Sequence, residues 1–273
     1  MGPVRMRFAA LLALAGLAAA ASAAEPLRLA SIPWRDPATL AALYAPTTEL
    51  LQRKLGRPVE FYVARNYEDL TQRIAAGAAD LGVYGPASYV LAKRRLPGLR
   101  YLATCLVPDD HYYSFIIVRR DRAWQRLADL KGRTLGLGDR ESTSGNLVPR
   151  RMFASAGIDV DRDMTVFLLK RHYRVYEAVA EGTIDAGAAH SGAWDDAVRR
   201  HGDVFRVLAR SAPLPREPVV AAPHLDAALV QRLRETLAAA ARDPAFAAAG
   251  GELKGYAVRD EHFYDSVRAL MPD

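Results

Sequence analysis

GDRESTSGNLVPR, residues 138–150, joins an apolar strand at residues 134–137 to a helix expected to run to residue 156. The junction contains three hydroxyl side chains in succession, and serine and threonine are strong N-cap residues. Backbone N–H groups in the first turn of a helix have no acceptor within that helix, and Gly145 lets a ligand come close to the backbone. The stretch therefore predicts either an ordinary helix cap or a site for a phosphate-like anion, formed by Ser142, Thr143 and Ser144.

Residues 1–24 have the pattern of a cleaved secretory signal peptide. Arg5 and Arg7 precede an apolar run over residues 8–20, which ends in small residues. A transmembrane helix needs about 20 apolar residues, so this run is too short to act as an anchor. The single cysteine, Cys105, lies far from the cleavage site, and a lipoprotein is not expected. We therefore predict a periplasmic protein that is not a lipoprotein.

The remaining chain of about 250 residues is long enough for one large domain or for two lobes with separate cores. Loss of Arg5 and Arg7 would lower the formal net charge from +6 to +4, and the other basic residues are dispersed among acidic ones. This pattern does not predict a nucleic-acid-binding stripe. Cys105 has no partner for an internal disulfide, so a buried, unreactive thiol is expected. The histidines show no metal-ligand spacing, and neither a metal nor a cofactor is expected.

Strands and helices alternate along the chain, and the order β-α-β-α-β occurs twice. The expected strands are residues 27–32, 58–63, 80–84, 101–106, 113–119, 134–137, 165–169, 184–188 and 204–208, and a proline-bearing segment follows at 213–218. The expected helices are residues 36–55, 67–74, 124–130, 144–156, 173–181, 226–241 and 261–270. This order predicts an α/β protein of two lobes, each a mostly parallel sheet flanked by helices, with ligands at the carboxyl ends of the strands.

The chain is expected to return from the second unit to the first, so that two strands join the lobes. The crossings are predicted near residues 114–119 and 208–221, where lobe closure would be absorbed by a few residues. The predicted organisation is a signal peptide at 1–24, one lobe from 25–114 and 219–273, and a second lobe from 115–218.

Four stretches carry a family resemblance: residues 138–150, DLGVYGPASYV at 80–90, DLKG at 129–132 and EAVAEGTIDAG at 177–187. They resemble the PhnD-like periplasmic substrate-binding proteins of phosphate, phosphite and phosphonate ABC transporters, over nearly the whole chain after residue 24. The resemblance implies a type II periplasmic-binding-protein fold whose lobes close over a small phosphorus oxyanion. It also implies a monomer that passes this ligand to an ABC permease in the inner membrane, without covalent chemistry.

The resemblance assigns ligand-binding roles to individual residues. It implies that the three hydroxyl residues at 142–144 bind the phosphoryl or phosphonyl oxygens. Tyr67 and Tyr112 match two pocket tyrosines, which can each donate one hydrogen bond. His172 matches a histidine that faces the ligand and, if charged, would donate to an anion. Tyr84 is a further candidate because it ends a strand near the cleft, and His190 follows another strand and could also reach the cleft.

Two positions depart from the family pattern. Members that bind aminoalkyl phosphonates have an acidic residue where this chain has residues 191–193, which include no carboxylate. A family aspartate is replaced here by Glu217, before Pro218. A carboxylate accepts hydrogen bonds only, so Glu217 would favour a hydrogen-bearing monoanion, or a ligand with a hydroxyl or short amine, over a bare dianion. A surface-turn role for Glu217 stays open at this point.

Two other functions are considered beside oxyanion transport. A protein of the same fold could present its ligand to a receptor or sensor kinase instead of a permease. A periplasmic enzyme is disfavoured, because the chain has no G-x-S-x-G elbow, no Walker lysine and no evident acid to orient His172. The sequence therefore predicts binding and release rather than catalysis.

Overall fold

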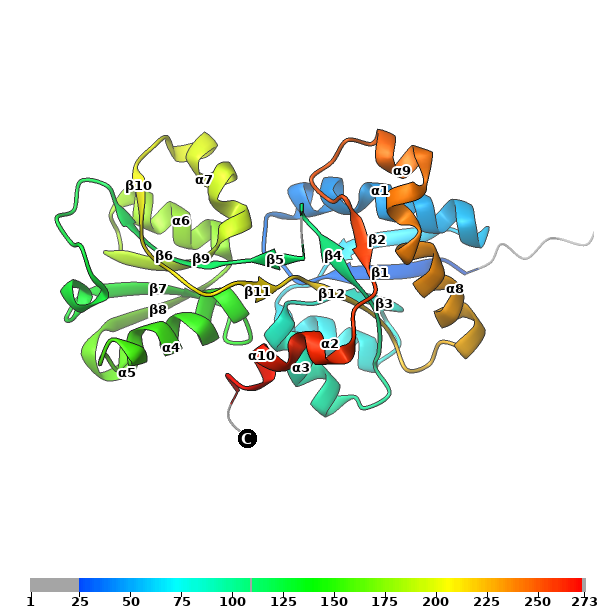
Figure 1. The fold of residues 1–273 in the computed structure, drawn as a ribbon, viewed down its shortest axis with the longest axis horizontal. Helices are drawn as coiled ribbons and strands as arrows, with labels where there is room; N and C mark the ends of the chain where they lie inside the picture. Colours follow the sequence, from blue (N-terminus) through cyan, green and yellow to red (C-terminus); the bar gives the residue numbers. More distant parts are fainter. Residues whose placement is uncertain (1–24, 109, 272–273) are drawn as a thin grey trace, which may run out of the picture.

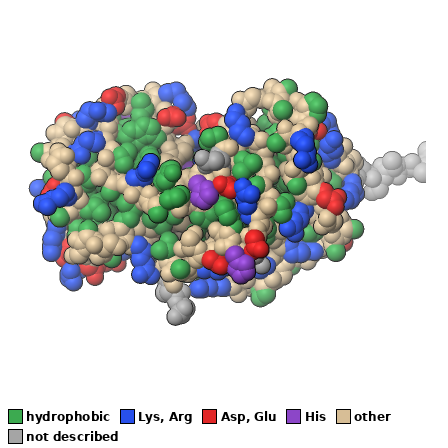
Figure 2. Space-filling model, in the orientation of Figure 1, with side chains coloured by type: hydrophobic (Ala, Val, Ile, Leu, Met, Phe, Trp, Pro, Cys, Tyr) green, Lys and Arg blue, Asp and Glu red, His purple; other side chains and the backbone are tan. Residues whose placement is uncertain are grey.

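The computed structural model describes residues 25–108 and 110–271, so the predicted signal peptide at 1–24 lies outside the described residues. Two sheets, each covered by helices, lie at the two ends of an elongated molecule (Figure 1). Within the described residues, no helix is long and apolar enough to cross a membrane. On the face shown in Figure 2, lysine and arginine side chains are dispersed and not gathered into a stripe.

The first lobe contains a six-stranded sheet in the order β13-β4-β12-β3-β1-β2. β1 pairs in parallel with β2 and β3, whereas β12 runs antiparallel to β3 and β4, and β13 runs antiparallel to β4. The strands of this sheet are β1 (Leu27–Ser31), β2 (Val59–Val63), β3 (Leu81–Val83), β4 (Arg100–Leu106), β12 (Pro218–Ala221) and β13 (Gly255–Ala257).

The second lobe contains a five-stranded sheet in the order β10-β6-β9-β7-β8. β7 pairs in parallel with β8 and β9, whereas β6 runs antiparallel to both β9 and β10. Its strands are β6 (Ser114–Arg119), β7 (Thr134–Gly138), β8 (Thr165–Lys170), β9 (Ala186–His190) and β10 (Phe205–Arg210).

Both sheets are mixed and not mostly parallel as the alternation of strands and helices predicted. The parallel pairs lie within β1–β3 and β7–β9, where helices connect each strand to the next, as expected for β-α-β units. The antiparallel pairs arise where the chain enters and leaves a lobe, because β6, β10 and β12 run against the strands beside them. Strand direction at these positions depends on the path of the chain between lobes, which the local pattern does not contain.

The helices of at least four residues cover the sheets of both lobes (Figure 1). The sequence pattern does not predict α3, α5, α7 or α9. Pro86 is the first residue of α3, a position that suits proline. The helix expected at 124–130 is only a 3₁₀ turn, Leu127–Leu130. The helices are α1 (Pro37–Leu55), α2 (Tyr67–Ala75), α3 (Pro86–Arg95), α4 (Val148–Ser155), α5 (Val160–Asp163), α6 (His172–Glu181), α7 (Trp194–His201), α8 (Ala227–Ala238), α9 (Pro244–Ala248) and α10 (Asp265–Arg268).

Two short strands between the sheets form the crossing. β5 (His111–Tyr112) pairs antiparallel with β11 (Leu214–Pro215), and the two lie side by side between the lobes (Figure 1). The first crossing thus precedes the expected segment 114–119, which is β6 and belongs entirely to the second sheet. The second crossing lies inside the expected segment 208–221.

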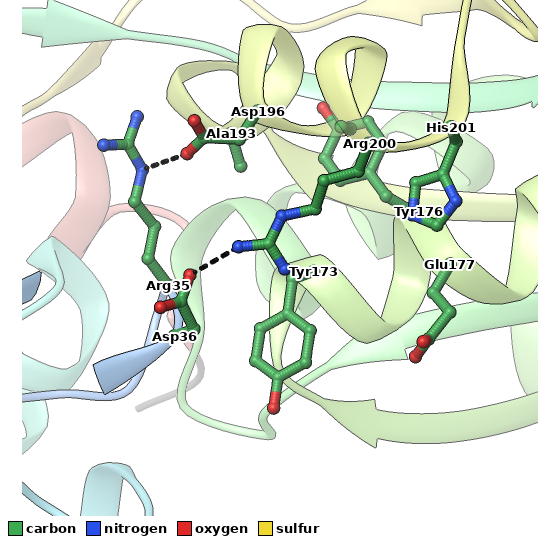
Figure 3. Close-up of a pocket in the computed structure, with 10 residues that line it drawn as sticks. Arg35, Asp36, Tyr173, Tyr176, Glu177, Ala193, Asp196, Arg200 and His201 are labelled. Carbon is green, nitrogen blue, oxygen red and sulfur yellow. Dashed lines mark hydrogen bonds and ion pairs between the residues drawn. The ribbon is translucent and has the colours of Figure 1, made fainter. Parts of the chain in front are cut away.

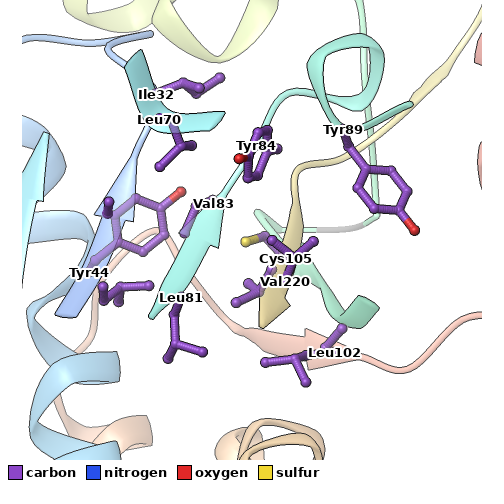
Figure 4. Packing of buried hydrophobic residues seen from close by; sticks show 14 of the residues in the cluster. Ile32, Tyr44, Leu70, Leu81, Val83, Tyr84, Tyr89, Leu102, Cys105 and Val220 are labelled. Atoms are coloured by element: carbon purple, nitrogen blue, oxygen red, sulfur yellow. The ribbon is translucent and has the colours of Figure 1, made fainter. Parts of the chain in front are cut away.

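The core of the first lobe is a single cluster around β1, β3, β4 and β12, part of which is drawn in Figure 4. Cys105 lies in this cluster, and burial raises the pKa of its thiol, which agrees with the expectation of an unreactive side chain. In the second lobe, separate clusters of buried residues pack with the two faces of the sheet.

A glycine of β9 lets α6 pack closely against the second sheet. Gly136 of β7 lies opposite Gly187 of β9. A Cβ atom on Gly187 would lie 2.4 Å from Cγ1 of Val175 and 3.0 Å from Cγ2 of Val179, both on α6. The close approach fixes the position of α6, whose first residue is His172.

We expect Gly187→Ala to lower the free energy of unfolding by roughly 1–3 kcal/mol, because the added methyl group overpacks the contact with α6. Urea denaturation of the mature protein measures the change. Gly251→Ala is the matched control, because a Cβ atom there would meet nothing within 4 Å. Equal stability of the two variants would contradict the close packing of α6.

Candidate functional site

The stretch at residues 142–144, called the serine turn below, caps a helix as its sequence predicted. Ser142 is the N-cap of the π turn Thr143–Leu147, and its Oγ accepts a 3.0 Å hydrogen bond from the Gly145 N–H. A Cβ atom on Gly145 would lie 2.9 Å from both Cε1 of His172 and Oγ of Ser142, so only glycine fits without movement. The N–H groups of Thr143 and Ser144 lie in the first turn and have no acceptor within the helix.

The serine turn is held from both lobes. The Ala87 N–H, in the first turn of α3, donates a 2.8 Å hydrogen bond to Oγ1 of Thr143 across the interface between the lobes. On the other side, Oγ of Ser114 at the start of β6 donates to the carbonyl oxygen of Ser144 at 2.7 Å. All three residues of the turn are buried.

Two of the predicted tyrosines converge on the serine turn from separate elements. Tyr67 is the first residue of α2, and its hydroxyl interacts with Ser142. Tyr112 lies in β5, and its hydroxyl interacts with Thr143 and Ser144. Burial raises the pKa of both phenols, which opposes ionisation, so each keeps an O–H group that can donate.

His172 is neutral, in contrast to the charged form considered from the sequence. Burial, followed by the neighbouring His190, lowers its pKa to about 3. Its Nδ1 accepts a 3.2 Å hydrogen bond from the backbone N–H of His190. The proton of the neutral ring is therefore on Nε2, which lies 3.4 Å from Oγ of Ser142. His172 can still donate one hydrogen bond at the turn.

This tautomer argues against a nucleophilic serine. A histidine that activates a serine must accept the hydroxyl proton. The nitrogen of His172 that faces Ser142 already carries a proton, because the other nitrogen is an acceptor. Within residues 25–108 and 110–271, no group of three or more histidine, cysteine, aspartate or glutamate residues could hold a metal ion.

Glu217 is buried and ionised, so it is not a surface-turn residue. Its Oε1 lies 3.1 Å from Nε2 of His190, and Nδ1 of His190 accepts a 2.8 Å hydrogen bond from the Gly192 N–H. His190 therefore donates to the carboxylate through Nε2. Burial favours the neutral carboxyl of Glu217, but the hydrogen bond from His190 and the charge of Arg216 outweigh it and lower the pKa to about 2.

Aromatic rings hold His190 in place. Tyr112 stacks on its ring with centroids 4.1 Å apart and an interplanar angle of 11°. Trp34 also contacts the ring, with centroids 4.7 Å apart. The imidazole thus connects Glu217 to the tyrosine that meets the serine turn.

Three residues beside the serine turn had little or no support from sequence. His190 was noted only for its position after a strand, Trp34 follows the end of β1, and Arg216 precedes Glu217. The sequence offered two signals. Trp34 is an aromatic residue after a strand end, and Arg216 and Glu217 are a charged pair at a crossing between the lobes. Neither signal separates a pocket residue from a core or surface residue.

Tyr84 packs in the core of the first lobe (Figure 4). A Cβ atom on Gly82 would lie 2.6 Å from Cε2 of its ring. Its hydroxyl lies beside Thr71, and burial raises its pKa. None of the contacts described for Tyr84 involves the serine turn.

A second set of contacts joins the lobes around a cavity of about 140 Å³ (Figure 3). Arg35, from the segment after β1, donates to the carbonyl oxygen of Gly192, and its Nε lies 3.3 Å from Oδ2 of Asp196. Asp36 pairs with Arg200 at 2.9 Å. The lobes are therefore in contact beside the serine turn as well as through it.

Comparisons with known proteins agree with this architecture. The family model described as "ABC transporter, phosphonate, periplasmic substrate-binding protein" matches residues 29–261. The Phosphate-import protein PhnD of Mycolicibacterium smegmatis is 28% identical over 191 residues, which cover 66% of this chain and 60% of that protein. The Phosphonates-binding periplasmic protein of Escherichia coli K12 is 32% identical over 111 residues, 39% of this chain and 33% of that protein. The matches thus span less than two thirds of either relative.

Solved structures share the two-lobed fold. PhnD1 from Prochlorococcus marinus (MIT 9301), solved in complex with methylphosphonate, has a TM-score of 0.82 and 17% identity, covering 89% of this chain and 96% of that chain. XAC2383 from Xanthomonas citri, bound to chloride ion, has a TM-score of 0.74 and 25% identity, covering 89% and 95%. Because the family model extends over both lobes and the serine turn between them, this chain belongs to the family of periplasmic substrate-binding proteins of phosphonate ABC transporters.

Proposed function

We propose that the protein binds a small phosphorus oxyanion, namely phosphate, phosphite or a phosphonate, at the serine turn and delivers it to an ABC permease of the inner membrane. The observation that carries this proposal is the meeting of hydroxyl donors from separate elements at one buried turn. Tyr67, Tyr112 and His172 surround Ser142, Thr143 and Ser144. The names of the relatives support phosphorus oxyanions as the ligand class.

The donors suit an oxyanion because they need no proton transfer to bind it. The serine turn offers hydroxyl groups and the N–H groups of a first helical turn. Each tyrosine and His172 can add one O–H or N–H group. Hydrogen bonds to a charged group contribute more than neutral ones, and burial away from water strengthens them further.

Binding is proposed to close the lobes on the ligand. Tyr67 belongs to the first lobe and the serine turn to the second, so a ligand held by both stabilises their contact. The β5–β11 pair is the proposed hinge, because it lies between the two sheets. Arg35 and Asp196 add a contact between the lobes beside the site.

The permease is proposed as the partner because the family is defined by ABC transport. Delivery to a receptor or sensor kinase remains the alternative, and no feature among residues 25–108 and 110–271 favours it. The periplasmic location is proposed on the same family grounds, together with the sequence pattern at 1–24. The protein is proposed to act as a monomer.

Ser144→Ala should weaken binding of inorganic phosphate or methylphosphonate by roughly 1.5–3 kcal/mol, the range for a hydrogen bond to a charged group. Isothermal titration calorimetry of the mature protein measures this change. Ser155→Ala is the control, because Ser155 ends α4 and is exposed. Unchanged affinity in a folded Ser144→Ala protein would remove the serine turn from the binding site.

Saturating ligand should reduce the radius of gyration measured by small-angle X-ray scattering, because the open lobes close. Arg35→Met should weaken ligand binding by about 1 kcal/mol or more, since it removes a partly buried ion pair between the lobes. Arg53→Met is the control, because Arg53 pairs with Asp243 within the first lobe. Superimposable scattering curves and equal affinities would contradict closure.

His172→Asn should lower the affinity at every pH between 5.5 and 8.5 without changing the shape of the pH dependence. A pKa of about 3 keeps His172 neutral throughout this range, so its own titration contributes nothing. The expected pH dependence comes from the ligand, whose second ionisation falls near pH 6–7 for phosphate-like groups. Calorimetric titrations of both proteins test this. If the variant loses a pH dependence that the unmodified protein has, His172 titrates on binding and the prediction is wrong.

A further inference from the structure

Arg216 is a buried cation whose hydrogen-bonding capacity is largely unused. The residue is 5% exposed and lies where the chain passes from β11 to β12. Its backbone is fixed on both sides, because its N–H donates to the carbonyl oxygen of Asp110 and its own carbonyl accepts from the Tyr264 hydroxyl. Among the described residues, Nε and Nη1 of its guanidinium have no hydrogen-bond partner.

The guanidinium lies beside the proposed ligand site. Its Cζ is 5.9 Å from the ring centroid of Tyr112, whose hydroxyl reaches the serine turn. Nη1 is 4.0 Å from Oε2 of Glu217, beyond hydrogen-bond range. The nearby His172 and His190 are held neutral by burial, which lowers the pKa of each. Arg216 and Glu217 therefore place one positive and one negative side chain beside Tyr112, and the charge of Arg35 also acts on His190.

Unused donors on a buried guanidinium need an explanation. A buried polar group without a hydrogen bond is costly, and nearly all such groups in folded proteins have partners. Arginine presents its donors as a rigid planar fork that matches carboxylate and phosphate oxygens. A ligand with an acceptor oxygen at this end would supply the missing partner.

Glu217 is poorly placed to receive an ammonium group. Oε1 already accepts from His190, and Oε2 is the oxygen nearest to Arg216. Residues 191–193 provide no second carboxylate. An ammonium group at this end of the site would therefore lie near the like charge of Arg216 and would compete with it for Oε2 of Glu217.

On the basis of the proposed function, we infer that Arg216 is a specificity-determining residue that hydrogen-bonds an acceptor oxygen of the ligand beyond the oxygens held by the serine turn. The site then prefers a phosphorus oxyanion with an additional acceptor group, such as a carboxylate, and discriminates against a phosphonate with an ammonium group. This preference differs from the amine considered for Glu217 on sequence grounds.

Three phosphonates that differ at one end test this inference. Methylphosphonate has no second polar group, phosphonoacetate has a carboxylate, and 2-aminoethylphosphonate has an ammonium group. In calorimetric titrations of the mature protein, phosphonoacetate should bind at least about tenfold more tightly than methylphosphonate, a difference of about 1.4 kcal/mol. 2-Aminoethylphosphonate should bind more weakly than methylphosphonate.

Arg216→Gln should remove most of the preference for phosphonoacetate and change the affinity for methylphosphonate less than about threefold. Arg210→Gln is the control, because Arg210 is exposed and lies over the ring of Tyr113. A uniform loss for all three ligands would make Arg216 a structural residue and overturn the inference. Stronger binding of 2-aminoethylphosphonate than of phosphonoacetate by the unmodified protein would also overturn it, without any variant. Failure of all three ligands and of phosphate to bind would instead contradict the proposed function.

Discussion

The hydrogen bond from the Ala87 N–H to Oγ1 of Thr143 joins the lobes at the residue that also helps to form the serine turn. Hydrogen-bond donors that are buried without partners cost about 1–3 kcal/mol each, so a turn that presents them needs support from the surrounding structure. Ser114 and Gly145 provide this support on the second lobe, by a hydrogen bond and by close packing. Because the serine turn lies between the lobes, the burial of the turn depends on contact between the two lobes.

A chain of contacts from Gly192 to the serine turn determines which nitrogen atoms of His190 and His172 carry a proton. The Gly192 N–H fixes the tautomer of His190, and the backbone of His190 fixes the tautomer of His172. The proton that faces Ser142 is then a donor, which suits an anion and does not suit activation of a nucleophile. The backbone N–H group of His190 therefore leaves His172 as a hydrogen-bond donor toward Ser142, which favours binding of an anion over catalysis.

The local parts of this account could be predicted from the sequence. The serine turn follows from N-cap chemistry after an apolar strand, and Tyr67 and His172 followed from a family resemblance. The pairing of His190 with Glu217 and the position of Arg216 could not be predicted, because they depend on how β9 and the crossing strands pack together. The prediction of mostly parallel sheets was wrong for the same reason, because strand direction is set by the path of the chain between the lobes.

A crystal structure of the mature protein grown with methylphosphonate tests the central claim most directly. The account predicts the phosphonyl oxygens within hydrogen-bond distance of the serine turn, with the hydroxyls of Tyr67 and Tyr112 and Nε2 of His172 as further donors. Methylphosphonate bound elsewhere, for example in the cavity beside Arg35 and Asp196, with the serine turn unoccupied, would contradict it.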